Sequence, residues 1–178
     1  MIEILDDLDV LLRPYIDLTA IGLGGTALGA PASDVPRGSI VEAQSSLVAR
    51  YRGGTTVESE YFDAEERRLT LDEVIDHAVH SDGFLYCADE LTYKVRGGTV
   101  VGFALYGRHL SHFAHLTSYE EFLAAFGTPD RVHEDETYGE LMGYDAYYWG
   151  SRKHVKWDAW DHRVGLVNMG DFEGNTGP

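Results

Sequence analysis

Two stretches of the sequence share the residues Arg-Gly-Gly-Thr: "RYRGGTTV" at Arg50–Val57 and "KVRGGTVV" at Lys94–Val101. In each stretch, runs rich in β-branched and aromatic residues lie on both sides of the Gly-Gly pair. Glycine readily adopts the positive φ angles of a two-residue hairpin turn, so the pattern predicts antiparallel strands joined at Gly53-Gly54 and at Gly97-Gly98. A phosphate-binding loop would instead need a helix directly after the glycines, and strand-like runs follow here.

Two further segments have the apolar spacing of amphipathic helices. The first is "TLDEVIDHAVHSDG" at Thr70–Gly83, where Thr70 and Glu73 form a capping box and Gly83 is expected to close the helix. The second is "TSYEEFLAAFGTPD" at Thr117–Asp130, where the box begins at Thr117 or Ser118. A third, shorter helix is expected near Ile4–Leu12, ending before Pro14.

The last third of the chain is rich in strand-forming residues. Strands are expected in "DAYYW", "HVKWDAW" and "RVGLVNMG", with a turn in "DAWDH" between the last two, and the tail "GDFEGNTGP" is expected to fray. Together these elements predict an α+β fold, in which an antiparallel sheet built from hairpins packs against two or three helices. We expect a single domain over 1–178. The segments "ALGAPASDV" and "AFGTPDRV" are similar to each other, which leaves open that the domain consists of two related halves, about 1–110 and 111–178.

The charge balance restricts the partners of the chain. Thirty Asp and Glu oppose fourteen Lys and Arg, for a net charge of −16. Such a surface repels nucleic acid and anionic lipid and attracts a basic partner. No apolar run approaches the roughly 20 residues of a membrane span, and the acidic first residues differ from a signal peptide. With a single cysteine, Cys87, the sequence favours a cytoplasmic protein without nucleic-acid or membrane partners.

Two histidine-containing segments offer an alternative, that of a metal-dependent enzyme. "HLSHFAH" spaces His109, His112 and His115 three residues apart, so successive pairs could share one face of a helix. "KHVKWDAWDHRV" contains two more histidines and two aspartates, which suit acid–base chemistry or metal binding. Neither segment has a recognised catalytic or zinc motif, so we expect a non-enzyme without a cofactor.

The stretch "DRVHEDETYGELMGYDAYYW" at Asp130–Trp149 has the most unusual composition, with acidic residues followed by aromatic ones. Aromatic side chains supply anchoring area at interfaces, and carboxylates steer a basic partner. The alternative is that the aromatic side chains face the core while the acids belong to a solvated loop. Both interpretations remain open from the sequence.

In size, acidity and lack of a catalytic motif, the chain resembles the immunity proteins of bacterial toxin–immunity systems. The run "FGTPDRVHEDETYGELMGYDAYYWGSRKHVKWDAW" at Phe126–Trp160 looks like the helix–turn–sheet segments common in those proteins. The pattern of helix, Gly-x-Pro and hairpin also looks like the repeated unit of the β-lactamase-inhibitor-protein type of fold. The resemblance implies a small protein that neutralises a cognate toxin by occluding its active site.

The leading hypothesis is therefore an inhibitor that binds a basic protein toxin domain. Non-catalytic scaffolding is a further alternative. The residues expected to contact the partner are acidic and aromatic side chains of the last third: Glu134, Asp135, Glu136, Glu140, Tyr144, Asp145, Trp149, Asp158, Trp160 and Asp161.

Overall fold

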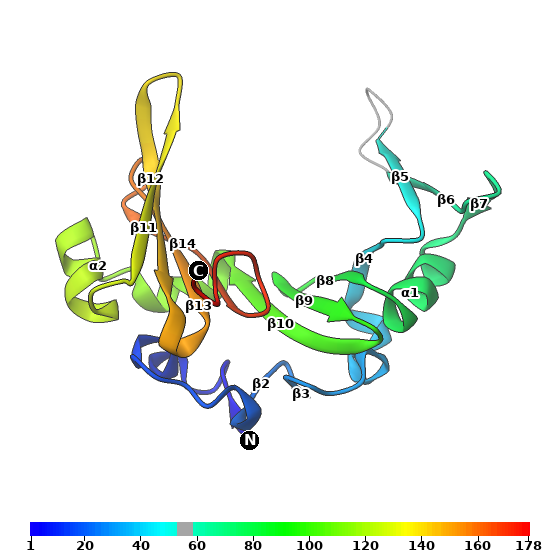
Figure 1. Ribbon diagram of the computed structural model, residues 1–178, viewed down its shortest axis with the longest axis horizontal. Helices are drawn as coiled ribbons and strands as arrows, with labels where there is room; N and C mark the ends of the chain where they lie inside the picture. Colours follow the sequence, from blue (N-terminus) through cyan, green and yellow to red (C-terminus); the bar gives the residue numbers. More distant parts are fainter. Residues whose placement is uncertain (53–58) are drawn as a thin grey trace. The chain divides into compact units, whose positions relative to one another are not determined.

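The computed structural model describes residues 1–52 and 59–178, so the turn predicted at Gly53-Gly54 lies outside the described residues (Figure 1). The chain forms two compact units. Unit 1 comprises Met1–Leu28 and Gly102–Pro178, and unit 2 comprises Gly29–Val101. Both contain mostly antiparallel strands and one α-helix each, which makes the chain α+β. The single domain with two related halves stays a prediction.

Unit 1 is built on antiparallel strands in the order β11-β12-β13-β14-β10. These strands are β10 (Thr99–Tyr106), β11 (Arg131–Thr137), β12 (Glu140–Tyr148), β13 (Lys153–Asp158) and β14 (Arg163–Gly170). A small second sheet contains β1 (Ile2–Glu3), β2 (Ile21–Leu23) and β3 (Thr26–Ala27). The strands predicted in the last third of the chain, and the turn between β13 and β14, are confirmed.

One α-helix of unit 1 covers its sheet. α2 (Tyr119–Phe126) begins at Ser118, whose side chain forms the capping box with Glu121, and ends at Gly127, where φ is 84°. Phe122 is fully buried, with its ring centre 5.6 Å from that of Trp157 on β13. The 3₁₀ helices of unit 1 are η1 (Leu8–Leu12), η2 (Leu18–Ala20), η5 (Gly107–Phe113) and η6 (Trp149–Ser151).

The helix expected near Ile4–Leu12 is wrong as an α-helix. The segment contains only the five-residue 3₁₀ helix η1, which follows β1. Glu3 accepts hydrogen bonds from the amides of Gly24 and Gly25, so the chain is held in a strand up to that point. Pro14 forces the preceding residue into an extended conformation. Between these two constraints the backbone closes i→i+3 hydrogen bonds, such as Asp7 N–H to Ile4 O and Val10 N–H to Asp7 O, which are those of 3₁₀ turns.

The C-terminal tail does not fray as expected. Asn175 is fully buried, and its side-chain amide donates to the carbonyl oxygens of Arg152 and Gly170 and to Asn168 Oδ1. These bonds satisfy backbone acceptors at the ends of β13 and β14. A polar, Gly-rich composition therefore forms a docked turn here, because one buried asparagine bonds three acceptors at this corner of the sheet.

Unit 2 pairs its strands in the order β9-β8-β4 and, in a separate sheet, β5-β6-β7. Its strands are β4 (Ile40–Ser45), β5 (Ala49–Arg52), β6 (Ser59–Phe62), β7 (Arg68–Leu69), β8 (Gly83–Cys87) and β9 (Leu91–Arg96). Its helices are η3 (Ala32–Asp34), η4 (Arg37–Ser39) and α1 (Leu71–His80). The turn predicted at Gly97-Gly98 is confirmed, with φ angles of 53° and 75°.

Gly83 has a different role from the one predicted. α1 begins at Thr70 with the expected capping box but ends at Ser81, and Gly83 is the first residue of β8. A Cβ atom at Gly83 would lie 1.9 Å from the carbonyl oxygen of Gln44 on β4. Close approach of two backbones, rather than helix termination, is therefore what requires glycine here. Within the described residues, no helix combines the length and apolar character needed to cross a membrane.

Lys153 is a fully buried cation in unit 1. Its ammonium donates to the backbone carbonyl oxygens of Leu11 and Arg13, and it lies 4.7 Å from the ring centre of Tyr148 and 5.4 Å from that of Phe126. Burial lowers the pKa of Lys153 to about 8, because the charged form loses its hydration. The N-terminal segment is thus fastened to β13 by a lysine that is costly to keep charged.

The lowered pKa of Lys153 predicts that unit 1 becomes more stable between pH 8 and pH 9.5. In this range the unfolded chain still binds the proton that the folded chain has released, so the free energy of unfolding rises with pH, by about 1–2 kcal/mol. Burial also raises the pKa of Tyr148. This shift lowers the free energy of unfolding as the pH rises, but only above about pH 10. Urea titrations across this range should show the rise in the native chain and lose it in Lys153→Met. An equal rise in both proteins would contradict the assignment.

Candidate functional site

The acidic stretch forms a long hairpin rather than a loop. β11 and β12 pair antiparallel from Arg131↔Tyr147 to Thr137↔Glu140, and the two residues between them, Tyr138 and Gly139, have φ angles of 54° and 81°. Positive φ at both positions is the geometry of a tight hairpin turn. It places Tyr138 at the end of the hairpin with its side chain completely exposed.

The far half of this hairpin extends beyond the neighbouring strand. β13 pairs with β12 only from Gly143 to Tyr148, so the part of the hairpin between residues 136 and 142 has no strand of the main sheet beside it. Figure 1 shows it as the yellow hairpin reaching away from α2 and β13. A bulge after Asp135 marks where the projection begins. Every residue of β11 except Asp135 is exposed.

Exposed apolar side chains gather at this end of unit 1. Trp160, in the turn between β13 and β14, is 69% exposed, and Leu141 is 38% exposed. A hollow of ≈ 470 Å³, hereafter the tip hollow, is lined by Thr137, Tyr138, Glu140, Met142 and Trp160. Large exposed aromatic side chains beside a concavity are typical of protein interaction surfaces.

Three of the predicted acidic residues have free carboxylates. Glu134, Glu136 and Glu140 are exposed and, among the residues that the structure describes, none has an ion pair or a side-chain hydrogen bond. Neighbouring negative charges without counter-ions create a local field that attracts cations. These three glutamates and the tip hollow together are named the acidic tip.

Two other predicted acids are instead held within the sheet. Asp135 accepts a hydrogen bond of 2.6 Å from Lys156 Nζ, which lowers the pKa of Asp135 and raises that of Lys156. Asp145 accepts from His154 Nε2 at 2.7 Å and lies 3.8 Å from the His133 ring. The Asp135 carboxylate is therefore neutralised by Lys156, and the Asp145 carboxylate is already hydrogen-bonded, before any partner arrives.

Asp158 and Asp161 shape the β13–β14 turn. Asp158 Oδ1 accepts from the backbone amides of Trp160 and Asp161, both at 2.9 Å. Asp161 forms an ion pair of 2.8 Å with Arg163. Asp158 thus holds the turn that presents Trp160, and neither aspartate is free of local partners.

The predicted aromatic anchors differ in exposure. Tyr144 stacks on Tyr119 of α2, with ring centres 3.9 Å apart, and is only partly exposed. Trp149 is half-buried and donates its indole N–H to the carbonyl oxygen of Gly174 in the tail. Trp160 alone of these three is largely exposed. Sequence reasoning missed Tyr138, although the Tyr-Gly pair between two strand-like runs was a hairpin-turn signal.

A polar chain of hydrogen bonds crosses the buried part of the same sheet. His154 is buried, donates from Nε2 to Asp145 and approaches the Asn168 side-chain amide at 3.0 Å through Nδ1. Burial lowers the pKa of His154, although the Asp145 carboxylate acts in the opposite direction. Asn168 continues to Asn175 of the tail. This chain ties the tail to the sheet, and it leaves His154 only 8% exposed.

The histidines of the alternative hypothesis do not converge. His112 Nε2 lies 2.7 Å from Asp9 Oδ1, and His115 Nδ1 lies 3.2 Å from the carbonyl oxygen of His112. η5 ends at Phe113, so His109 and His112 belong to a 3₁₀ helix and His115 follows it. Across residues 1–52 and 59–178, no group of three His, Cys, Asp or Glu side chains is arranged to hold a metal ion.

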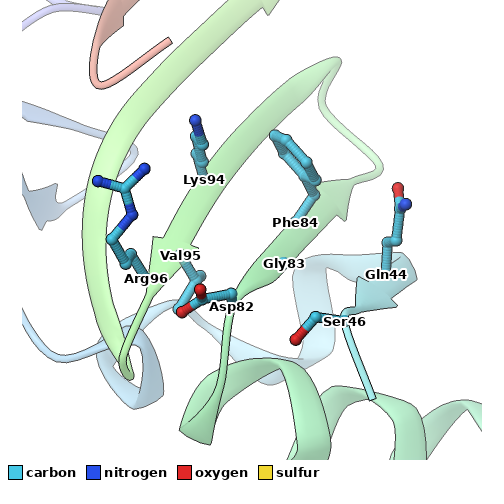
Figure 2. Close-up of a pocket in the computed structure, with 8 residues that line it drawn as sticks. All are labelled: Gln44, Ser46, Asp82, Gly83, Phe84, Lys94, Val95 and Arg96. Carbon is cyan, nitrogen blue, oxygen red and sulfur yellow. The ribbon is translucent and has the colours of Figure 1, made fainter. Parts of the chain in front are cut away.

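Unit 2 has a hollow of its own, of ≈ 220 Å³, on strands β4, β8 and β9. Figure 2 shows the side chains of Gln44, Phe84 and Lys94, which are cross-strand neighbours, on one side of the sheet. Asp82 at its edge accepts a hydrogen bond from the Gly97 amide. None of the residues predicted to bind a partner lines this hollow.

Comparison with known proteins finds no matching family model, no similar curated protein and no similar solved structure. The case for a function therefore depends on the geometry and charge of the acidic tip.

Proposed function

We propose that this chain is the immunity protein of a bacterial toxin–immunity pair, which binds a basic toxin domain through the acidic tip and covers its active site. The observation behind the proposal is that one projecting hairpin combines unpaired carboxylates with the exposed Tyr138, and that the exposed Trp160 lies beside it in the β13–β14 turn. The chain acts by binding, without turnover.

Charge governs how fast the partner approaches, and apolar area governs how long it stays bound. A net charge of −16 accelerates the encounter with a cationic partner, and the free carboxylates of Glu134, Glu136 and Glu140 give that attraction a direction. Tyr138 and Trp160 then supply apolar area that is lost from water on binding. A narrow, acidic hairpin suits the cleft of a toxin that normally accepts an anionic substrate.

The proposal also places the chain in the bacterial cytoplasm, where a toxin that enters or is made in the cell must be neutralised. A reducing compartment suits Cys87, which is buried and forms no disulfide. The repulsion between the acidic surface and phosphate groups argues against nucleic acid as the partner.

A growth assay tests the aromatic half of the proposal. The partner to be tested is the product of the neighbouring gene. It is expressed from an inducible plasmid so that it arrests growth, and the native chain is expected to restore growth. The double variant Tyr138→Ala/Trp160→Ala should fail to protect, because each central aromatic contributes about 2 kcal/mol or more to such an interface.

The matched control is Tyr15→Ala, since Tyr15 is 71% exposed but lies in the N-terminal segment of unit 1. It should protect as well as the native chain. Full protection by the double variant, at equal expression, would refute a role for the hairpin end. A neighbouring product that neither arrests growth nor binds the chain would refute the toxin–immunity proposal itself.

A further inference from the structure

The tip hollow combines two kinds of wall. Tyr138 and Trp160 contribute exposed aromatic rings, and Met142 contributes a polarizable thioether. Glu140 contributes a carboxylate that has no ion pair within the described part of the chain. Aromatic faces and a carboxylate share one preference, which is for a cation.

The backbone on the Trp160 side of the tip hollow is held by hydrogen bonds before any ligand binds. Asp158 holds the amides of Trp160 and Asp161, and the Ala159 amide donates to the carbonyl oxygen of Met142 at 2.9 Å. Trp160 is thereby attached to β12 next to the hairpin end. A site whose walls are already positioned loses less conformational freedom on binding. Asp158 is therefore a positioning residue for this hollow.

We propose that the tip hollow binds the guanidinium group of an arginine side chain presented by the partner protein. A guanidinium is planar, stacks on aromatic rings and pairs with a carboxylate through two parallel N–H donors. It can therefore stack on the rings of Tyr138 and Trp160 and pair with the Glu140 carboxylate at the same time. The inference rests on the proposed function for the source of the arginine, but the hollow itself can be tested without the partner.

Other ligand classes match the walls less well. A neutral apolar group would remove water from the Glu140 carboxylate without replacing its hydrogen bonds. A phosphate or carboxylate would be repelled by Glu140 and by the neighbouring Glu134 and Glu136. A lysine ammonium can pair with Glu140, but as a compact, strongly hydrated charge it does not stack along a ring.

The test is an NMR titration with Nα-acetyl-arginine N-methylamide, followed through the indole N–H signals of the three tryptophans. The spectrum of Trp160→Phe identifies the Trp160 signal. The arginine compound should shift the signals of Trp160 and of the Tyr138–Gly139 amides. The citrulline analogue, which keeps the shape but lacks the charge, should bind about fivefold more weakly.

Glu140→Gln should weaken arginine binding about threefold, whereas the control Glu65→Gln, at an exposed glutamate of unit 2, should leave it unchanged. Equal binding of the arginine and citrulline compounds would overturn the inference, as would tighter binding of the lysine analogue. The inference would also be overturned if, in both Trp160→Phe and Trp160→Ala, the arginine compound still shifted the Tyr138–Gly139 amide signals and bound with unchanged affinity.

The inference and the proposed function can fail separately. If the arginine compound binds the tip hollow but no basic protein binds the chain, guanidinium binding by the hollow is supported and the immunity function is refuted. If a toxin domain binds the chain while the Trp160 indole signal stays unchanged, the function is supported and the arginine assignment is refuted.

Discussion

Replacing Phe122 by Ala is expected to lower the free energy of unfolding of unit 1 by about 3–5 kcal/mol. The Phe122 side chain is fully buried, and its ring centre lies 5.0 Å from that of Phe126 and 5.6 Å from that of Trp157. Alanine removes the ring but leaves α2 in place, so a cavity remains between the helix and β13. Since all three tryptophans are in unit 1, urea denaturation followed by tryptophan fluorescence measures this loss directly.

The control is Glu120→Ala, an exposed position on the same helix. It should change the free energy of unfolding by no more than about 0.5 kcal/mol. A loss of less than about 1 kcal/mol in Phe122→Ala would show that α2 does not cover the sheet as described, because a buried aromatic ring cannot be removed so cheaply.

Gly83→Ala is the second change with a large expected effect. The added Cβ would lie 1.9 Å from the carbonyl oxygen and 2.9 Å from the carbonyl carbon of Gln44. Both atoms are backbone atoms of β4, which pairs with β8, so the strands must separate locally. We expect a loss of at least about 3 kcal/mol in unit 2, at the upper end of overpacking effects. Native-state hydrogen exchange of the β4 and β8 amides is the measurement.

Gly38→Ala is the matched control in the same unit. No atom lies within 4 Å of a Cβ added there, and Gly38 does not have a positive φ. It should leave the exchange rates unchanged or lower them slightly, since alanine reduces the entropy of the unfolded chain. If Gly83→Ala and Gly38→Ala behaved alike, the close approach of β4 and β8 would be disproved.

Local chemistry explains which elements could be predicted. Thr70 with Glu73 and Ser118 with Glu121 form both hydrogen bonds of a capping box, and each box depends on residues three apart in the sequence. Gly97-Gly98 likewise determines its own turn. By contrast, the role of Gly83 depends on a strand that precedes it by some forty residues. No local pattern in the sequence distinguishes a glycine that is required by a neighbouring strand from a glycine that ends a helix.

The candidate site was predictable in composition but not in arrangement. The sequence indicates that acidic residues followed by aromatic ones gather after Asp130, but strand register decides which of them remain free. Asp135 meets Lys156, and Asp145 meets His154, only because β11, β12 and β13 pair in one register. The hydrogen bond from Asn175 of the tail to the carbonyl oxygen of Arg152 is likewise non-local. Gly139 is a turn signal in the sequence, but Tyr138 beside it is not, because a bulky residue rarely occupies positive φ.

The most direct test is calorimetric titration of the purified chain with the neighbouring gene product at low and at high salt. Two triple variants with the same change in net charge are compared with the native chain. Glu134→Gln/Glu136→Gln/Glu140→Gln neutralises the acidic tip, and Asp6→Asn/Asp34→Asn/Glu65→Gln neutralises exposed acids elsewhere.

The expected result is tight binding by the native chain that weakens with salt, a loss of about 100-fold for the tip variant at low salt, and a much smaller loss for the control variant. Equal affinities of the two variants at low salt would contradict the claim that the acidic tip is the binding surface.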